Sequence, residues 1–251
     1  MGNKRFGCLI AVLTGLLCLS LLVNLIFIVW GSSSSTAAVR PQEAPKFDEQ
    51  LVVPAKNNSS QKIALIYLRG VISGMGSGSV GVTAVEDLRI QLKQAANDPK
   101  VKAVLLYVDS PGGEVTASDT IYNAVRRVRD EAKKPVIVYM GSMAASGGYY
   151  VACGGSWIIA NETTFTGSIG VIMQTLNYEQ LFGKVGLQTF TFKSGKFKDM
   201  LSGSRPMSDE EKQYVQGLVM QTYGKFVGIV ARERGLPEEE IALRVRSYWR
   251  E

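Results

Sequence analysis

The sequence contains no histidine among its 251 residues. Histidine is the usual general base for a serine or cysteine nucleophile, so its absence excludes Ser-His-Asp and Cys-His hydrolases. A hydroxyl nucleophile in this chain has to pass its proton to another group. A lysine kept neutral by burial is the leading candidate for that role.

Cysteine is scarce as well. Cys8 and Cys18 lie in an apolar N-terminal run, which leaves Cys153 alone in the rest of the chain, so no disulfide can form within that part. Cys153 follows Ser146 by seven residues, two helical turns, and we expect the two residues to share a helix face. We interpret Cys153 as a small buried packing residue rather than a second nucleophile.

Charge is not concentrated in any one stretch. The formal net charge is +6, and basic residues alternate with acidic ones, as in residues 126–131. This pattern indicates a solvated surface, and we expect no nucleic-acid partner.

Charged residues are absent from Phe6 to Trp30, a run long enough to span a bilayer core of about 30 Å. Lys4 and Arg5 precede the run, and the next basic residue is Arg40. The positive-inside rule therefore places the N-terminus in the cytoplasm and the chain after Trp30 outside. A cleaved signal peptide is the alternative, with small residues at 35–37, but the run is longer than a usual signal-peptide core.

These patterns predict four parts. Residues 1–5 form a cytoplasmic N-terminus, 6–30 a transmembrane anchor, 31–60 a flexible tether rich in Ser, Ala, Pro and Asn, and 61–251 one extracytoplasmic domain.

Within the domain, apolar runs alternate with amphipathic segments. We expect strands at 62–68, 101–108, 135–140, 157–160, 169–173 and 188–192, and helices at 83–96, 117–133, 146–153 and 207–234. The last helix has Ser208 as its N-cap and Glu211 as capping partner. This order predicts an α/β fold with a mostly parallel sheet.

Two glycine-containing motifs follow neighbouring strands. Residues 109–113 (DSPGG) end the second strand, and 143–150 (MAASGGYY) follow the third and contain Ser146. Because functional sites of parallel α/β sheets lie beyond the carboxyl ends of the strands, we expect the two loops to be neighbours. An ordinary turn and a simple N-cap serine are the alternatives.

Three further segments attract attention. Residues 166–171 (TGSIGV) form a glycine loop with a second exposed hydroxyl, that of Ser168. Residues 193–198 contain three lysines, and an ordinary basic surface turn is the alternative explanation for them. Residues 76–81 match a dinucleotide-binding pattern, but residues 69–75 separate them from the strand, so the turn is not tight and we interpret them as a surface loop.

Taken together, the stretches 104–113, 135–150, 166–171 and 192–199 resemble peptidase family S49, the signal peptide peptidase A (SppA) family, in its short single-domain bacterial form. The similarity runs from about Lys62 to the end of the chain. It implies a fold related to the Clp protease and crotonases, built from repeated β-β-α or βαβ units. Family members continue beyond the position of Glu251, so we expect a C-terminally truncated domain.

The resemblance also implies site roles. Ser146 and Lys198 would form a Ser/Lys dyad, with Lys198 chosen because it follows the aromatic Phe197. Gly113 and Gly147 would supply oxyanion N–H groups, and Ser168 would hydrogen-bond the lysine. No metal or other cofactor is implied. Related enzymes pair serine and lysine from adjacent copies, which implies a homo-oligomer.

We therefore expect a serine endopeptidase, anchored in the bacterial cytoplasmic membrane by one helix, that hydrolyses released signal peptides and other apolar unfolded peptides. Its partners would be these peptides and the lipid bilayer. A catalytically inactive scaffold that binds apolar segments, and a crotonase-like thioester enzyme, are the alternatives.

Overall fold

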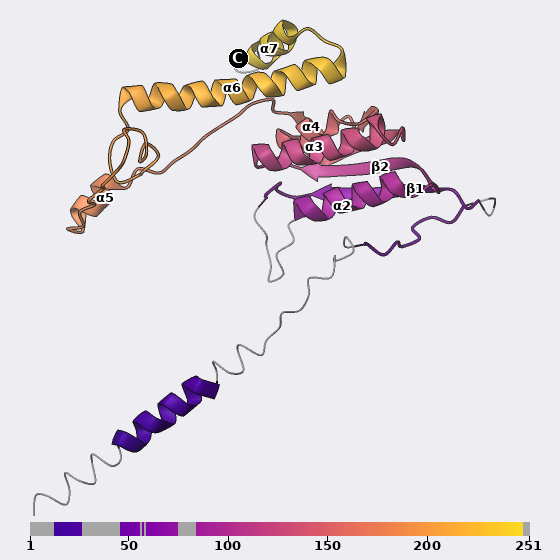
Figure 1. The fold of residues 1–251 in the computed structure, drawn as a ribbon. Helices are drawn as coiled ribbons and strands as arrows, with labels where there is room; N and C mark the ends of the chain where they lie inside the picture. The colour runs from indigo at the N-terminus through magenta and orange to yellow at the C-terminus, as the bar shows by residue number, and fades with distance from the viewer. Residues whose placement is uncertain (1–12, 27–45, 56, 58, 75–83, 248–251) are drawn as a thin grey trace, which may run out of the picture. The chain divides into compact units, whose positions relative to one another are not determined.

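A computed structural model of the chain describes residues 13–26, 46–55, 57, 59–74 and 84–247 (Figure 1). The chain divides into two compact units, Met1–Pro45 and Lys46–Glu251. In the first unit, residues 13–26 form a short helix with exposed leucine side chains. Within the described ranges, no helix combines the length and the apolar character needed to cross a membrane. The predicted anchor 6–30 extends past this helix at both ends into residues outside the described ranges. Most of the predicted tether and the whole motif at 76–81 also lie outside those ranges.

The second unit is built on a five-stranded parallel sheet with the order β1-β2-β3-β4, in which β5 pairs with the end of β3. The strands are β1 (Lys62–Arg69), β2 (Val101–Ser110), β3 (Val136–Ala145), β4 (Trp157–Ala160) and β5 (Phe165–Gly167). The strands predicted at 62–68, 101–108, 135–140 and 157–160 are confirmed. All strands run in one direction, so their carboxyl ends lie at one edge.

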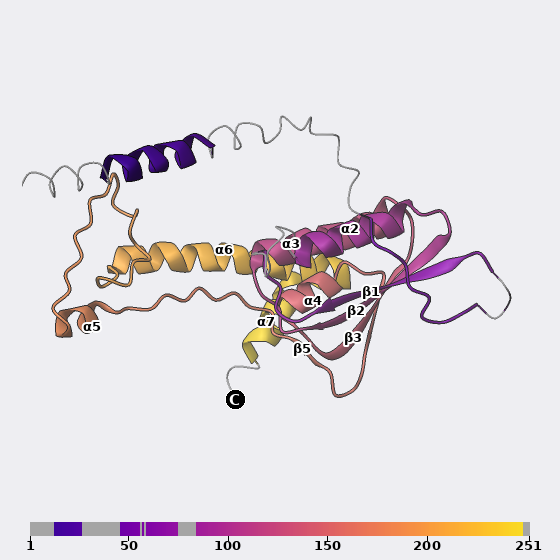
Figure 2. The same cartoon turned by 90° about the horizontal axis from the view of Figure 1, so that it is seen from below.

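The helices are α2 (Ala84–Asn97), α3 (Val115–Asp130), α4 (Gly147–Ala152), α5 (Glu179–Lys184), α6 (Asp209–Arg234) and α7 (Glu238–Ser247). Of these, α2, α3 and α4 pack on the sheet. In Figure 2, α2 and α3 lie side by side against the sheet. Alternate strand residues such as Val104, Leu106 and Val138 are fully buried against Val125 and Val128 of α3. Burial of each such side chain stabilises the fold by about 1.5–3 kcal/mol.

The opposite face of the sheet is not covered by any described element. Tyr67, Tyr107 and Tyr139 lie in register across three strands, with successive ring centroids 5.6 and 5.8 Å apart. The Arg69 guanidinium lies 4.5 Å from the Tyr67 ring centroid. Parallel sheets are normally buried on both faces, so this aromatic surface is unusual for a strand face.

Helix α6 begins as the sequence predicts. The Ser208 hydroxyl accepts a hydrogen bond from the Glu211 N–H, and the Glu211 carboxylate accepts one from the Ser208 N–H. The C-terminal half of α6 packs against α3 and α4 in a second apolar cluster, where the Phe226 ring contacts Tyr150 and the Tyr150 ring contacts Tyr122. The N-terminal half is largely exposed.

Two predicted strands are absent from the structure. Residues 169–173 and 188–192 form neither helix nor strand, and they belong to a long segment, 168–206, which we call the arm. Figures 1 and 2 both show α5, within the arm, lying away from the sheet. Apolar residues at 169–173 and 188–192 suggested strands, but strands need neighbours to pair with, and the described part of the chain supplies none here.

Candidate active site

Ser146 lies between β3 and α4 in a strained backbone conformation. Its φ is 51° and its ψ is −120°, a combination that a residue with a Cβ rarely adopts. Its N–H donates to the Gly167 carbonyl, 2.8 Å away, and its carbonyl accepts from the Tyr150 N–H at 2.9 Å. The hydroxyl does not cap α4, and it has no hydrogen-bond partner among the described residues. Ser146 is therefore more than an N-cap, because the fold holds its hydroxyl free at a strained turn.

The two glycine motifs are neighbours, as the sequence predicts. A Cβ on Gly112 would lie 2.6 Å from the Gly147 nitrogen and 2.8 Å from the Ser146 Cβ. Gly112 also has a φ of 96°, which favours glycine. A Cβ on Gly147 would collide with the Ser118 hydroxyl oxygen. Larger residues at either position would push the loops apart, so glycine is required by close approach.

Two backbone N–H groups stand free beside Ser146. Gly147 is the first residue of α4, where N–H groups have no partner within the helix. The Gly113 nitrogen lies 3.2 Å from the position that a Gly147 Cβ would occupy. Neither N–H donates to a main-chain carbonyl of the described residues. Such a pair can stabilise the negative oxygen of a tetrahedral intermediate.

Hydrogen bonds on both sides fix the Gly113 peptide. The Ile72 N–H donates to the Gly112 carbonyl at 2.9 Å, and the Glu114 N–H donates to the Ile72 carbonyl at 2.8 Å. The pairing satisfies the groups that flank Gly113 and leaves its own N–H unpaired.

The buried side chain of Ser110 holds the loop 109–113 in place, a role that was not predicted from the sequence. Its side chain is fully buried, and its hydroxyl donates to the Gly70 carbonyl at 2.6 Å and accepts from the Gly112 N–H at 3.1 Å. The neighbouring Asp109 carboxylate accepts from the Met143 N–H at 3.0 Å, where the register between β2 and β3 shifts. A polar pair at the end of an otherwise apolar strand is the signal that could have identified both residues.

Ser168 also adopts a left-handed conformation, with a φ of 50°. It follows β5, whose Gly167 pairs with Ala145, so the loop 166–171 lies directly beside Ser146. Ser168 is exposed in this loop.

Lys198 does not lie at Ser146 of its own chain. Its residue is exposed, in a loop of the arm that packs on the first half of α6, where Phe197 stacks on Tyr214. The Ser146 pocket contacts α6 at Thr222, Lys225 and Phe226. These residues lie eight to twelve positions beyond Tyr214, which corresponds to about 12–18 Å along the helix. No described contact joins the Lys198 amine to Ser146 or Ser168, so the predicted dyad is not assembled within one chain.

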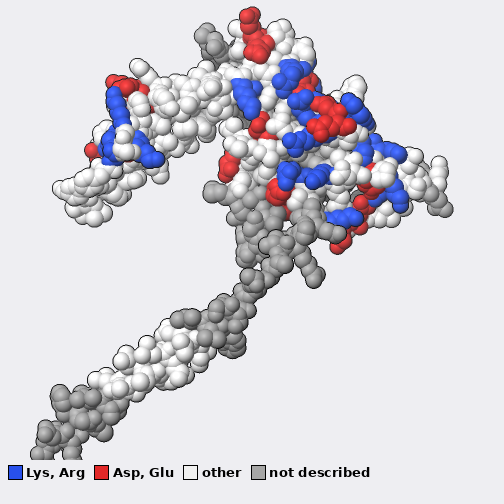
Figure 3. Space-filling model, viewed as in Figure 1, with Lys and Arg blue, Asp and Glu red and all other residues white. Residues whose placement is uncertain are grey.

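Ion pairs anchor the Lys198 loop. Asp199 accepts hydrogen bonds from Arg205 and Lys193 at 2.8 and 2.7 Å, and these bonds hold the pKa of the Asp199 carboxyl well below its usual range. Arg205 also pairs with Glu211, whose pKa the same guanidinium lowers to about 2. Figure 3 shows the resulting group of blue and red side chains near the N-terminal end of α6.

A different lysine lies near the serine in the same chain. Lys225 lines the small pocket at Ser146, about 30 Å³ in volume, together with Val115, Tyr150 and Phe226. Its amine is 2.9 Å from the Asp119 carboxylate, which also accepts a hydrogen bond from the Tyr150 hydroxyl at 2.6 Å.

Burial opposes ionisation of Asp119, but the hydrogen bonds from Tyr150 and Lys225 outweigh it and lower the Asp119 pKa. Burial, followed by the bond to Asp119, raises the pKa of Tyr150. The cluster ties α3, α4 and α6 together beside Ser146 with the Lys225 amine already engaged.

Metal ligands are not grouped in this region. Among the described residues, no set of three or more Asp, Glu, Cys or His side chains could hold a metal ion. Cys153 is buried, and burial raises the pKa of its thiol to about 12, which makes it a poor nucleophile.

Comparisons with known proteins agree with this geometry. The family model described as "Peptidase family S49" matches residues 128–244, and the model "Clp protease" matches residues 72–158. The latter supports a Clp protease-like α/β fold, in line with the parallel sheet.

Three relatives illustrate the similarity. "Putative signal peptide peptidase SppA" of Enterococcus faecium is 34% identical over 93% of this chain and 70% of its own length. "Putative protease slr0021" of Synechocystis is 36% identical over 76% of this chain, and "Protease 4" of Salmonella typhi 34% over 78%. The match spans 65% and 31% of those two proteins. With a relative this similar over most of both sequences and a serine held at a strained turn beside free N–H groups, the chain belongs to peptidase family S49, a family of serine proteases.

Proposed function

We propose that this chain is a serine endopeptidase in which Ser146 is the nucleophile and Lys198 of a second copy is the general base. The observation that carries the proposal is the free hydroxyl of Ser146 at a strained turn, next to the unpaired N–H groups of Gly113 and Gly147. Such an arrangement is typical of acyl transfer, in which the oxyanion must be stabilised as it forms.

The reaction would proceed in two stages. The Ser146 Oγ attacks the scissile carbonyl and forms an acyl-enzyme, while the lysine amine takes the hydroxyl proton and gives it to the leaving amine. Water then attacks the ester, with the same amine as base. The Gly113 and Gly147 N–H groups bind the oxyanion in both stages. Because an amine accepts a proton only when neutral, the lysine has to be buried when it reaches Ser146.

Contact with a second copy of the chain would bury the Lys198 amine. The arm exposes large apolar side chains, among them Ile172, Leu176, Phe190 and Phe192. The tyrosine-lined face of the sheet is uncovered as well. Apolar surface of this extent favours association between proteins. We therefore propose a homo-oligomer in which the arm of one copy brings Lys198, with Ser168 of the receiving copy as a hydrogen-bond partner.

Complementation tests the shared site. Ser146→Ala and Lys198→Ala proteins should each be inactive, and a mixture of the two under conditions of subunit exchange should regain part of the wild-type activity. Lys196→Ala is the matched control, because Lys196 lies in the same exposed loop and pairs with Glu210. Confirmed exchange without recovery would place the base within one chain.

The substrates that we propose are apolar, unfolded peptides such as released signal peptides. The relative of Enterococcus faecium carries that activity in its name, and the walls of the pocket at Ser146 include Val115, Val171 and Phe226. The ectodomain should cleave Leu- or Ala-rich peptides and leave folded proteins intact. A fluorophosphonate probe that fails to label Ser146 would favour an inactive scaffold instead.

We also propose that residues 6–30 anchor the chain in the cytoplasmic membrane with the peptidase domain outside. The support is the charge asymmetry around the apolar run, with Lys4 and Arg5 before it. Protease added to intact spheroplasts should degrade the domain. Complete protection would reverse this topology.

A further inference from the structure

Glu114 is an unusual residue for the start of a helix. It is the N-cap of α3, with a φ of −62° and a ψ of 135°, but its side chain makes no cap hydrogen bond to the described N–H groups of α3. The residues that usually occupy an N-cap are Ser, Thr, Asp and Asn, whose short side chains reach those N–H groups. The longer side chain of Glu114 serves a different contact.

That contact is with residues 73 and 74, which lie far from Glu114 in the sequence. The Ser73 hydroxyl donates to Glu114 Oε1 at 2.7 Å, and the Gly74 N–H donates to Glu114 Oε2 at 2.9 Å. These bonds, the one from Ser73 first, hold the pKa of the Glu114 carboxyl below its usual range. The group is therefore ionised at neutral pH, and both of its oxygens are acceptors. We call the two bonds the Glu114 clamp.

The clamped segment also carries the residue that orients the Gly113 N–H. The Ile72 N–H donates to the Gly112 carbonyl at 2.9 Å, and the Ile72 side chain is buried. A peptide unit is planar and trans, so the Gly112 C=O and the Gly113 N–H lie in one plane and point in opposite directions. The position of Ile72 therefore sets the direction of the Gly113 N–H.

The segment 70–74 is bonded to the active-site loop at both of its ends. At one end, the Ser110 hydroxyl donates to the Gly70 carbonyl at 2.6 Å. At the other end, the Glu114 clamp supplies the corresponding bonds. Ile72 lies between the two ends, so holding both of them fixes its main chain.

We propose that Glu114 is a positioning residue for the oxyanion hole. Its carboxylate holds the segment 70–74, and this segment in turn directs the Gly113 N–H toward an oxyanion formed at Ser146. The inference rests on the proposed function and adds to it a residue that does not touch the substrate. Because an oxyanion forms only as the reaction proceeds, loss of the clamp should lower kcat and leave KM nearly unchanged.

The first test shortens the side chain by one methylene group. Asp is a favoured N-cap, so Glu114→Asp should keep or raise the midpoint of thermal unfolding, while its carboxylate no longer reaches residues 73 and 74. With a short ester as substrate, kcat should fall about five- to tenfold and KM should change less than about twofold. A fully active Glu114→Asp protein would overturn the inference, as would a loss of kcat that is accompanied by a lower unfolding midpoint.

The conservative variant should restore activity. In Glu114→Gln the side chain keeps its length, can accept a hydrogen bond from the Gly74 N–H and can donate one to the Ser73 hydroxyl. We expect it to retain at least about half of the wild-type kcat. The matched control is Glu131→Ala, because Glu131 is also exposed and lies at the opposite end of α3. A loss in either protein as large as that in Glu114→Asp would contradict the role of the clamp.

A double-mutant cycle tests whether Ser73 and Glu114 act as one unit. Ser73→Ala and Glu114→Ala remove the two sides of the same hydrogen bond, so their effects on kcat should not combine fully. The double variant should lie within about twofold of Glu114→Ala alone. Effects that multiply fully would show that the two residues act independently, and the inference would be wrong.

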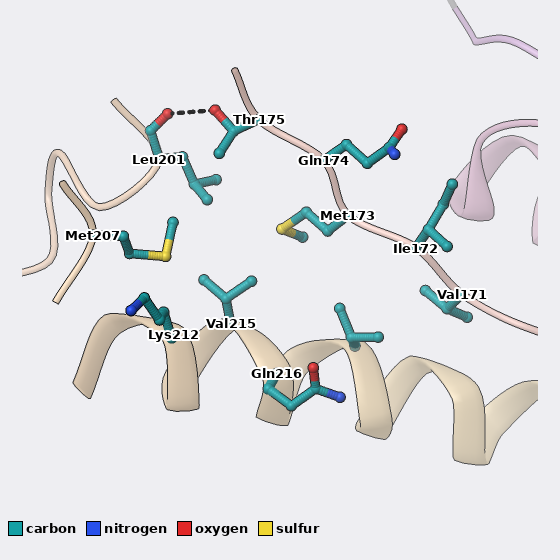
Figure 4. Close-up of a pocket in the computed structure, with 11 residues that line it drawn as sticks. Val171, Ile172, Met173, Gln174, Thr175, Leu201, Met207, Lys212, Val215 and Gln216 are labelled. Carbon is teal, nitrogen blue, oxygen red and sulfur yellow. Dashed lines mark hydrogen bonds between the residues drawn. The ribbon is translucent and has the colours of Figure 1, made fainter. Parts of the chain in front are cut away.

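Hydrogen exchange separates this inference from the catalytic proposal, because the measurement needs no activity. By mass spectrometry, amide exchange in residues 70–74 and 109–114 should be faster in Glu114→Asp than in the wild-type protein and unchanged in Glu114→Gln. Gln216→Ala should also leave it unchanged, because Gln216 borders the groove of about 450 Å³ between the arm and α6 (Figure 4) and lies in neither segment. Unchanged exchange in Glu114→Asp would refute the clamp, whereas wild-type protein whose Ser146 is not labelled by a fluorophosphonate would refute the catalytic proposal alone.

Discussion

The ring of Phe197 stacks on the ring of Tyr214, with centroids 5.3 Å apart and planes 10° from parallel. Phe197 immediately precedes Lys198, so this contact fixes the lysine loop on the exposed half of α6. The ion pairs of Asp199 with Lys193 and Arg205 hold the other side of the loop. Together they hold the Lys198 loop on the first half of α6, away from Ser146 of the same chain.

Removing the stack should therefore slow catalysis. We expect Tyr214→Ala to lower kcat about three- to tenfold, since aromatic pairs contribute about 0.5–1.5 kcal/mol, while Tyr214→Phe keeps the ring and retains activity. Steady-state kinetics on a short ester measures the effect. Met220→Ala is the control, because Met220 lies on the same helix with the same exposure of 48%. Equal losses in Met220→Ala would show that the stack has no specific role.

The anchoring of the arm should depend on pH. The Arg205 guanidinium lowers the Glu211 pKa to about 2 and holds the Asp199 pKa below its usual range. Carboxylates with lowered pKa values stabilise the folded state above their unfolded pKa, near 4, and lose this contribution as pH falls through the folded value. The arm should stay anchored at pH 5 and loosen between about pH 4 and pH 2.

Limited digestion with pepsin across this range should show the first cuts within residues 190–206. In Arg205→Gln the same cuts should already appear at a higher pH, because the substitution removes the guanidinium that pairs with both Asp199 and Glu211. A core that is cleaved before the arm would contradict the prediction.

Ser110 should act on the oxyanion hole and on stability together. Ser110→Ala leaves the Gly70 carbonyl and the Gly112 N–H without their buried partner, which costs about 1–3 kcal/mol in the free energy of unfolding. The rate of Ser146 labelling by a fluorophosphonate should fall about tenfold, because the adjacent Gly113 N–H loses its position. Thr120→Ala removes a surface hydroxyl that bonds Thr116 and should change neither quantity. An unchanged labelling rate would limit Ser110 to a structural role.

Two glycine-to-alanine substitutions should have opposite kinds of effect, one on the reactivity of Ser146 and the other on the stability of the fold. In Gly147→Ala the new methyl group collides with the Ser118 hydroxyl, so Ser146 labelling should fall by at least about a hundredfold, as when an oxyanion donor is lost. Gly217→Ala meets no atom within 4 Å on an exposed helix and should stabilise the protein by about 0.5–1 kcal/mol. For both variants, the midpoint of thermal unfolding measures stability and the rate of fluorophosphonate labelling measures the reactivity of Ser146. A Gly147→Ala protein that labels normally would show that the loops can separate without loss of function.

The elements predicted from sequence are those that depend on local pattern. Buried strands with continuous apolar residues, such as 101–108, and the capping box of Ser208 and Glu211 appear where expected. The helices α5 and α7 were not predicted, since α5 buries no residue and α7 begins with three glutamates. The expected strands at 169–173 and 188–192 failed because an apolar run does not specify whether a partner strand is available.

For the site, the order of residues along the chain was enough to predict the residue types and the edge of the sheet at which they meet. The glycine motifs and the parallel order of strands predicted that the loop of Ser146 and the loop 109–113 would be neighbours, because carboxyl ends of parallel strands share one edge. The strained turn at Ser146, the buried support by Ser110 and the separation of Lys198 from Ser146 became visible in the folded chain alone. These depend on contacts between residues far apart in sequence, such as the bond from Ser146 to Gly167 and the bond from Ser110 to Gly70. No local pattern encodes the distance between two distant loops.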